Sequence, residues 1–564
     1  MKQALFFSLM VFVACQSKPP LDNEHLYFNG EILTMEGDQP SYVEALAERD
    51  GKIVFVGSWA VAEKLFPRAT RKDLNGKTML PGFIDAHSHL MMYADAVRQA
   101  KLNPPPVGAV RNMKDIMEEL TSLRQRENLS DTSWLIGTGY DQDFLEEKRH
   151  PTAADLDTAF PTNPVVIMHA SGHMLVANGE AMKRAGISAK TPNPTGGTIL
   201  RKKGTQEPEG LIQEMAMYQF APFLQKKQPK VIERANLRKA QEYYASCGVT
   251  TAAEHLGMPD KLNFLQEAAA DSALFIDLEV LPAFLFAKDY VGTGKVNWGQ
   301  FNNHLKYAGL KLALDGSPQG KTAYLTKPYL TPVPGCESDC RGFSNLTQQQ
   351  VNNLFVLCYQ NNVQLYAHCN GDAAIDMMIK GHELATTTLK DTVSDRRTVI
   401  IHSQIMREDQ LDAYRKYGMI PTFFTNHAYY WGDVHLTNLG PDRADFISPM
   451  KSAIRKGIHP TNHTDCTVTP MDQLFLLWSS VNRLSRSGRV MGEAQRVTPY
   501  EGLQALTIHG AYQYFEEATK GSLKEGKLAD FVLLDKNPLK EDPGQIKEIV
   551  VLETIKEGKT IFKR

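Results

Sequence analysis

The sequence lacks the features of several protein classes. Only seven of its 564 residues are cysteine, and no CxxC pair or Cys/His finger spacing occurs, so zinc-finger modules are excluded. The formal net charge is -2 and no long basic run is present, which gives no indication of a nucleic-acid surface. With 42% hydrophobic and 22% charged residues, the composition is that of an ordinary globular protein.

The first twenty residues differ from the rest of the chain. A short cationic start precedes an apolar run over residues 4–14, which is too short to span a bilayer and is typical of a signal peptide. The sequence FVAC at 12–15 resembles a bacterial lipobox, in which the cysteine, here Cys15, becomes the lipidated N-terminus. We therefore expect residues 1–20 to be a signal peptide and lipoprotein tether. The protein would be exported and lipid-anchored to a membrane of the bacterial cell envelope, with ordinary secretion as the alternative.

Export permits disulfides. Cys336 and Cys340 lie in one loop, PGCESDCRG, and the sequence leaves open whether they are bridged. Cys369 and Cys466 are neighbours of candidate site residues, but strand alternation points their side chains to the opposite face. We expect them, with Cys247 and Cys358, to be buried thiols.

Both ends of the mature chain resemble small all-β pieces. Short strand-like runs flank Asn29-Gly30 and Asp50-Gly51, which are hairpin signals. The C-terminal segments GKLADFVLLD and EIVVLETIKEGKTIFKR have the same character. We predict one β-sandwich domain built from residues 21–80 and 515–564.

Residues 81–514 alternate apolar runs with amphipathic segments, which is typical of βα units around a parallel sheet. Eight strand candidates begin near residues 82, 248, 274, 309, 363, 398, 419 and 458. We predict an α/β fold, a (β/α)8 TIM barrel. The stretch from about 97 to 230 is too long for one βα connection, so we expect an insertion after the first strand, above the barrel mouth.

Several of these strands end in side chains that can bind a metal. In PGFIDAHSHL at 81–90, His87 and His89 are two residues apart on a strand and point the same way. Two neutral imidazoles form half of a metal site, although an isolated His-x-His is more often merely polar. The other strands supply Lys311 in KLALDG, His368 in YAHCNGD, His402 in IIHSQ and Asp465 in NHTDC. An ionisable side chain that is buried on its own has a desolvation cost. We therefore expect these histidine, lysine and aspartate side chains to lie close together.

These motifs resemble the amidohydrolase superfamily of metal-dependent hydrolases. The resemblance rests on LPGFIDAHSH, the lysine of LKLALDG, His368, His402 and Asp465, and the strands at both ends resemble its small β-sandwich. PVVIMHASGHMLVAN, TGGTI and YYWGDVH resemble the branch that includes N-substituted formamide deformylases and related exported hydrolases.

The resemblance implies two divalent metals, zinc first, with manganese, iron or nickel as alternatives. His87, His89 and Asp465 would hold one metal, and His368 and His402 the other. Lys311 would carry a bridging carbamate, because an ammonium beside two cations would be repelled.

The implied function is cleavage of a C–N bond in a small-molecule amide, formamide or cyclic imide by a metal-activated hydroxide, with Asp465 as general base and then acid. His173 in HASGHML and Trp431 in YYWGD are candidate substrate-binding residues. The alternatives are a mononuclear deaminase of the same superfamily, which would lack the bridging Lys311, and a non-catalytic ligand-binding lipoprotein on a decayed barrel. A homodimer is the default assembly.

Overall fold

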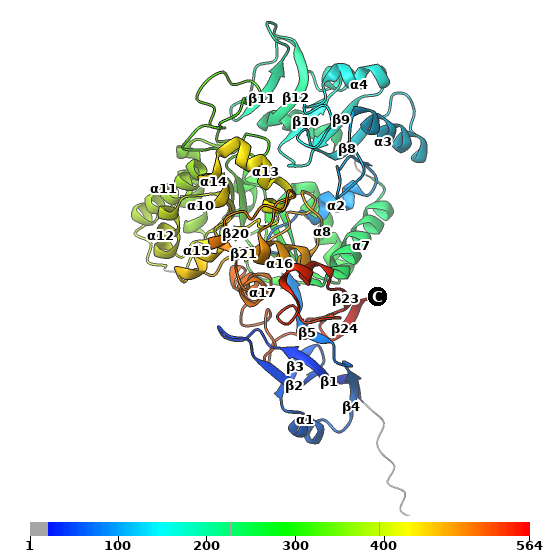
Figure 1. The fold of residues 1–564 in the computed structure, drawn as a ribbon, viewed down its shortest axis with the longest axis vertical. Helices are drawn as coiled ribbons and strands as arrows, with labels where there is room; N and C mark the ends of the chain where they lie inside the picture. The colour runs from blue at the N-terminus through cyan, green and yellow to red at the C-terminus, as the bar shows by residue number, and fades with distance from the viewer. Residues whose placement is uncertain (1–20, 225–227, 394) are drawn as a thin grey trace, which may run out of the picture.

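The computed structural model describes residues 21–224, 228–393 and 395–564. Its elements form three regions along the long axis (Figure 1): a sheet from both chain ends, an α/β core, and the segment that follows the first core strand. The predicted signal peptide, with Cys15 and the tether, lies outside the described residues. Within those residues, no helix combines the length and the apolar character that a membrane crossing requires.

Both chain ends join in one eight-stranded sheet, in the order β24-β23-β22-β5-β1-β2-β3, with β4 paired to β1. Its strands are β1 (Leu21–Leu33), β2 (Tyr42–Arg49), β3 (Lys52–Gly57), β4 (Ala69–Asp73), β5 (Thr78–Pro81), β22 (Phe531–Leu534), β23 (Val551–Lys556) and β24 (Lys559–Lys563), and α1 (Trp59–Leu65) follows β3. Strand β22 pairs antiparallel with β5, the strand that leads into the core. The division of this sheet into two sandwich layers stays a prediction.

One of the two hairpin predictions in this sheet is wrong. Asp50-Gly51 joins β2 to β3 as expected, with positive φ at both residues. Asn29-Gly30 lies inside β1, where the register with β2 shifts between Phe28 and Ile32, so it forms a bulge. A Cβ at Gly30 would meet Leu74 Cβ at 2.5 Å. Glycine is therefore required there for close approach of the chain, which the local pattern does not reveal.

The α/β core contains two five-stranded sheets, β15-β16-β14-β13-β6 and β17-β18-β19-β20-β21. The strands are β6 (Phe83–Ile84), β13 (Val249–Gly257), β14 (Asp277–Pro282), β15 (Phe301–Asn302), β16 (Leu305–Tyr307), β17 (Leu310–Ala313), β18 (Leu365–Gly371), β19 (Val399–Ile405), β20 (Ile420–Phe423) and β21 (Thr461–Asn462). Every predicted core run contains one of these strands. All neighbours pair in parallel except β15 and β16.

The two sheets meet at Ala308 and Gly309, where the fourth predicted strand begins. β16, just before this point, pairs with β14, and β17, within the predicted strand, pairs with β18. A single parallel bridge between Ala283 and Lys311 connects the sheets. The pairing therefore gives two sheets in barrel order, and a closed eight-stranded barrel stays a prediction.

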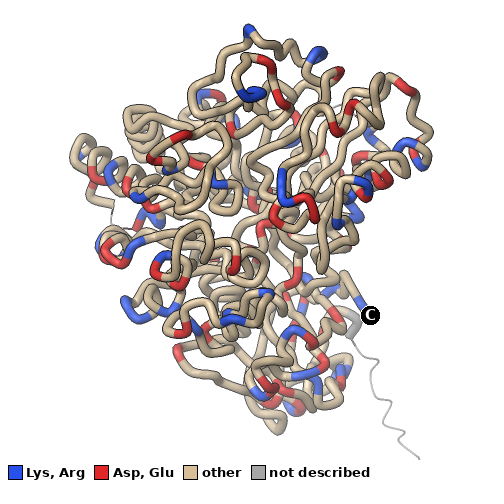
Figure 2. The backbone as a smooth tube through the Cα atoms, turned by 45° about the horizontal axis from the view of Figure 1, so that its top comes forward, with Lys and Arg blue, Asp and Glu red and all other residues tan. Residues whose placement is uncertain are grey.

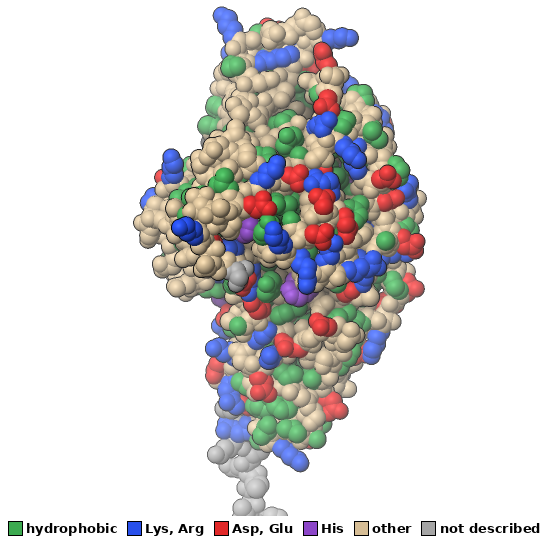
Figure 3. Space-filling view, turned by 90° about the vertical axis from the view of Figure 1, so that its left-hand side faces the viewer, with side chains coloured by type: hydrophobic (Ala, Val, Ile, Leu, Met, Phe, Trp, Pro, Cys, Tyr) green, Lys and Arg blue, Asp and Glu red, His purple; other side chains and the backbone are tan. Residues whose placement is uncertain are grey.

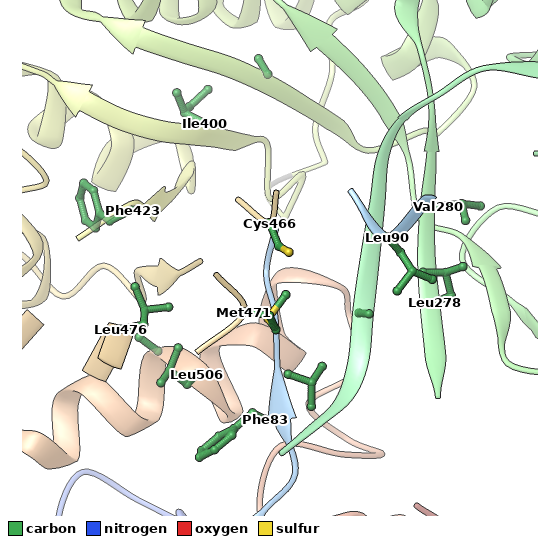
Figure 4. Packing of buried hydrophobic residues seen from close by; sticks show 14 of the residues in the cluster. Phe83, Leu90, Leu278, Val280, Ile400, Phe423, Cys466, Met471, Leu476 and Leu506 are labelled. Atoms are coloured by element: carbon green, nitrogen blue, oxygen red, sulfur yellow. The ribbon is translucent and has the colours of Figure 1, made fainter. Parts of the chain in front are cut away.

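Helices follow the strands and cover the sheets. They are α2 (Leu90–Ala96), α7 (Lys230–Ser246), α8 (Pro259–Ala270), η2 (Phe284–Phe286), α9 (Ala287–Tyr290), α10 (Gln348–Gln360), α11 (Asp372–Leu389), α12 (Glu408–Tyr417), α13 (His427–Leu439), α14 (Pro441–Asp445), α15 (Met450–Arg455), α16 (Gln473–Asn482), η3 (Glu493–Gln495), α17 (Pro499–Leu506), α18 (Ile508–Gln513) and η4 (Pro543–Glu548). Cys369 and Cys466 pack in the apolar cluster between helices and sheets, and Figure 4 shows the Cys466 sulfur among hydrocarbon side chains near Met471. These two thiols and Cys358 are buried, as predicted, but the prediction is wrong for Cys247, which is only partly buried near the end of α7. Cys336 and Cys340, left open by the sequence, form a disulfide.

The segment after the first core strand forms a six-stranded sheet of its own, in the order β11-β12-β10-β9-β8-β7. Its elements are β7 (Ala100–Lys101), α3 (Met113–Arg126), β8 (Leu135–Tyr140), α4 (Ala153–Ala159), β9 (Val165–His169), β10 (Met174–Ala177), α5 (Gly179–Arg184), β11 (Gly197–Arg201), β12 (Pro208–Glu214), η1 (Met215–Phe220) and α6 (Ala221–Leu224). Separate apolar clusters pack its two sides.

Charged side chains of both signs are mixed over the molecule. Basic and acidic positions are interspersed along the backbone (Figure 2), and the face in Figure 3 carries both kinds side by side. This distribution agrees with the formal net charge of -2.

A buried ion network fixes the core to the sheet from the chain ends. Asp277, at the start of β14, lies 3.0 Å from Lys556 Nζ and also pairs with Lys520. Lys556 in turn lies 3.0 Å from Asp530. Burial acts to raise the pKa of Asp277, but the two ammonium groups outweigh it and hold the pKa well below its usual value.

We expect Asp277→Asn to destabilise the protein by about 3–5 kcal/mol, because two buried ammonium groups lose a carboxylate partner. Urea unfolding of the full chain measures this change. Asp271→Asn, at a surface carboxylate that binds Arg234, is the control and should change the free energy of unfolding by no more than about 0.5 kcal/mol. Equal effects of the two substitutions would contradict the role given to the network.

Candidate metal centre

Asp465 lies at the point where the core strands bring their histidines together. Its Oδ1 is 3.2 Å from His87 Nε2 and 3.5 Å from His89 Nε2, and its Oδ2 is 3.9 Å from His402 Nε2. His402 Nε2 is also 2.9 Å from His368 Nδ1. The structure therefore brings together five of the six residues that the sequence indicated.

Lys311, the sixth, is buried on β17, and its Nζ has no hydrogen-bond partner among the described residues. Burial lowers the pKa of Lys311 to about 7, which is unusual for a lysine and gives it a substantial fraction of neutral amine at neutral pH. Burial lowers the pKa of His87 and of His368, and a charge on Lys311 lowers both further. Lys311 is therefore close enough to influence the same group of histidines.

The backbone is strained at two of these residues. His402 has φ 72° and Asp465 has φ 51°, in the left-handed region that non-glycine residues seldom adopt. Such conformations cost free energy and persist where the surroundings require them, often at functional sites. Here they direct the side chain of His402, in the middle of β19, and that of Asp465, after β21, toward the centre.

Hydrogen bonds fix which nitrogen of each imidazole faces the centre. Tyr514 Oη donates to the Ala86 carbonyl at 2.8 Å, so its oxygen accepts from His255 Nε2 at 3.3 Å. His255 Nδ1 is then the acceptor for His87 Nδ1 at 2.6 Å. His89 Nδ1 donates to the His255 carbonyl at 2.7 Å. Both His87 and His89 are left with a lone pair on Nε2, the atom that faces Asp465.

The electrostatics keep these groups in the form that a metal requires. Burial lowers the pKa of His87 and His402 well below the usual value, so both imidazoles are neutral at neutral pH. Burial acts to raise the pKa of Asp465, and a positive charge on His87 or His402 would outweigh it and hold the pKa well below its usual value; with these imidazoles neutral, a bound cation takes that part. Neutral imidazoles and an ionised carboxylate are good ligands for divalent metals.

The residues fit a metal by their distances and by their unsatisfied atoms. With metal–nitrogen bonds of about 2.0–2.1 Å, two tetrahedral ligand atoms of one ion are roughly 3.3 Å apart, and the contacts of Asp465 and His402 lie near that value. Within the part of the chain that the structure describes, no hydrogen-bond partner reaches Lys311 Nζ, His402 Nδ1 or Asp465 Oδ1. Buried polar atoms are rarely left in this state unless an ion or water is to bind.

Sequence reasoning gave no role to His463, which the structure places in this centre. It is buried, and its ring centroid is 4.9 Å from those of His87 and His402. Burial lowers the pKa of His463 to about 3, an effect partly offset by Asp465 and the Thr422 backbone. The signal was present in NHTD, because residues two apart on a strand share a face.

The candidate substrate-binding residues lie next to the centre or over it. His173 Nδ1 is 3.0 Å from Glu214 Oε2, and the His173 ring is 4.6 Å from that of His368. Trp431 is 3% exposed, and its indole donates to Asp141 of the insertion at 2.7 Å. The substrate-binding role of both residues stays a prediction.

Side chains of the insertion line two cavities at this edge of the core. One, of about 200 Å³, contains His173 and Glu214 with Met215, Met217 and Phe284. The other, of about 260 Å³, contains His89 and His255 with further apolar residues, Met91, Met168, Met258 and Ile136 among them. Tyr218 and Leu256 line both cavities. The candidate centre therefore opens toward an apolar, methionine-rich space.

Comparison with known proteins identifies the family of this chain. The amidohydrolase family matches residues 72–562, so the chain belongs to that family. N-substituted formamide deformylase of Arthrobacter pascens is 24% identical over 551 residues, with 96% of this chain and 98% of that protein covered. Protein LONG AFTER FAR-RED 3 of Arabidopsis thaliana is 27% identical over 558 residues, with 95% and 91% covered.

Among solved structures, an uncharacterized metal-dependent hydrolase from Pyrococcus horikoshii OT3 has a TM-score of 0.72 and 21% identity, covering 92% of this chain and 99% of that one. This likeness shows a TIM-barrel-like α/β fold. The family membership predicted from the motifs is confirmed, and it makes the protein a hydrolase of carbon–nitrogen bonds other than peptide bonds. Together with the donor set described above, it supports a divalent metal.

His255 provides a test of the hydrogen-bond chain. His255→Leu removes the acceptor for His87 Nδ1, and we expect metal affinity to fall about 10- to 100-fold, as is typical when a partner of a ligand histidine is lost. His255→Gln keeps an oxygen acceptor and should retain more of the affinity. Competition with a chromophoric chelator measures both variants, and equal affinities of the His255→Leu and wild-type chains would refute the assignment.

Proposed function

We propose that the protein hydrolyses an amide, formamide or cyclic imide C–N bond in a small molecule. The observation that carries this proposal is the ionised Asp465 carboxylate, buried among imidazoles that present lone pairs toward it. When bound, divalent metal ions supply Lewis-acid polarisation of a carbonyl and lower the pKa of water. His87, His89, His368, His402 and Asp465 would hold them.

Asp465 is proposed to move the proton of the reaction. Its carboxylate accepts a proton from the attacking water as the C–O bond forms. It then returns that proton to the leaving nitrogen as the C–N bond breaks, so the product amine leaves neutral. The first role requires only that the carboxylate is ionised before the reaction begins, as it is beside a bound cation.

Lys311 is proposed to carry a carbamate in the metal-loaded protein. The neutral Nζ attacks carbon dioxide, a C–N bond forms and one proton is released, which turns a neutral amine into an anionic carbamate. The pKa of about 7 that burial gives Lys311 makes the neutral amine available. This Nζ also has no hydrogen-bond partner in the described part of the chain, which supports a modified state.

His173 is proposed to bind the substrate carbonyl or acyl group. Burial acts to lower the pKa of His173, but the Glu214 carboxylate outweighs it and raises the pKa above its usual value. A protonated imidazole at this position can donate to the substrate oxygen. The apolar cavities beside it suit a hydrophobic substituent, which agrees with the N-substituted formamides named for the relative from Arthrobacter pascens.

A hydrolysis panel tests the proposed function. N-formyl, N-acyl and cyclic-imide compounds with alkyl or aryl substituents are incubated with the zinc- or manganese-loaded protein, and release of amine and acid is measured. Activity on at least one C–N class, abolished by chelation and restored by metal, is expected. Release of ammonia from amino-substituted rings instead, with one metal per chain, would favour a mononuclear deaminase. Full activity after complete metal removal would overturn the proposal.

Lys311→Ala should lose at least one metal per chain and most of the activity, because the bridging group is gone. A short carboxylic acid added to the variant should restore part of both. Elemental analysis and turnover are measured on the same samples. Wild-type metal content and activity in this variant would reject the carbamate.

Asp465→Asn separates proton transfer from metal binding. The amide keeps an oxygen donor but cannot take up the proton, so metal content should fall modestly while turnover falls by about 10²–10⁴. The loss should be largest for alkyl amines, which need protonation to leave, and smaller for nitroanilides. A loss that is uniform across leaving groups and follows metal content would show that Asp465 acts only as a ligand.

A further inference from the structure

His463 is unusual among the buried histidines of the described residues, because neither of its ring nitrogens has a partner at ordinary hydrogen-bond geometry, although the Thr422 backbone acts on its pKa. The others keep at least one, such as His382, which bonds Tyr359 Oη at 2.7 Å, and His427, whose Nδ1 bonds His435 Nε2 at 2.8 Å. A fully buried imidazole without partners at either nitrogen is unfavourable unless something else binds it.

The strand pairing aims His463 at the same centre as Asp465. Strand β21 pairs in parallel with β20, and His463 N continues the ladder by donating to the Phe423 carbonyl at 3.0 Å. Asp465 follows two residues later, past the end of β21 and with positive φ, and its side chain reaches the same centre. One ligand atom from each of His402, His463 and Asp465 lies within 4.8 Å of the others.

We propose that His463 is a metal ligand, which together with His402 and Asp465 holds a divalent first-row transition metal. Two imidazoles and one carboxylate suit zinc or iron(II). The competing role is packing, since the His463 ring also lies 4.9 Å from that of Phe424. Packing alone explains the burial of the ring but gives its two nitrogens no partner. The inference rests on the proposed function only in requiring that the centre bind metal.

Metal affinity provides the first test, and it does not depend on turnover. Apo full-length protein is titrated with zinc in competition with a chromophoric chelator, and bound metal is counted by elemental analysis. His463→Asn should weaken at least one zinc site by about 10-fold or more. His382→Gln is the matched control, a buried histidine outside the centre, and should bind zinc as the wild type does. Wild-type stoichiometry and affinity in His463→Asn would overturn the inference.

Cobalt provides a second test that a purely structural role would not affect. His463→Cys places a thiol at the proposed ligand position, and thiolate is a strong ligand for such ions. The cobalt(II)-loaded variant should show a thiolate-to-cobalt charge-transfer band that is absent from the wild type and from a His382→Cys control. If His463→Asn fails to fold, this band decides the question, and its absence from a folded, cobalt-loaded variant overturns the inference. A wild type that binds no metal would instead refute the proposed function.

Discussion

The site depends on one constraint: a single buried carboxylate must be shared by imidazoles that arrive from several strands. Asp465 contacts His87, His89 and His402, and no residue in the described chain gives its Oδ1 a hydrogen bond. Imidazoles can satisfy a carboxylate only by donating, and the hydrogen-bond chain through His255 assigns the His87 proton to the other nitrogen. The favourable state is therefore one in which a cation lies among the lone pairs, and the backbone strain at Asp465 and His402 agrees with that requirement.

Much of this centre follows from the sequence, because strand alternation is a local rule. The spacing of His87 and His89, and the positions of Lys311, His368, His402 and Asp465 at strand ends, are enough to predict that these side chains meet. The same rule applied to NHTD would have included His463. A single histidine in an apolar strand does not by itself indicate a metal ligand, however. Its role is indicated only by the residues that the fold places beside it.

Other features could not be predicted, because they depend on contacts between distant segments. Asn29-Gly30 has the composition of a hairpin, yet Gly30 is there to admit Leu74 at close range. The break between β16 and β17 at Gly309 arises where a Cβ would lie 2.3 Å from the Gln364 carbonyl, which belongs to a distant part of the sequence. Likewise, the pairing of His173 with Glu214 depends on the register of β10 and β12 within the insertion.

Buried charged groups have partners from the protein at one end of the core strands and lack them at the other. At the start of β14, Asp277 is surrounded by Lys520, Lys556 and His304, so the protein itself supplies the partners. A few residues on, the chain reaches Ala283, which bridges to Lys311, and there the buried polar atoms of the described chain face one another without enough donors. A paired network stabilises the fold on its own, whereas the other end gains stability only from what binds there. The ion pairs at one end of the strands thus offset the backbone strain and the desolvation of the groups at the other end. Fold stability and binding chemistry are therefore separated along the same strands.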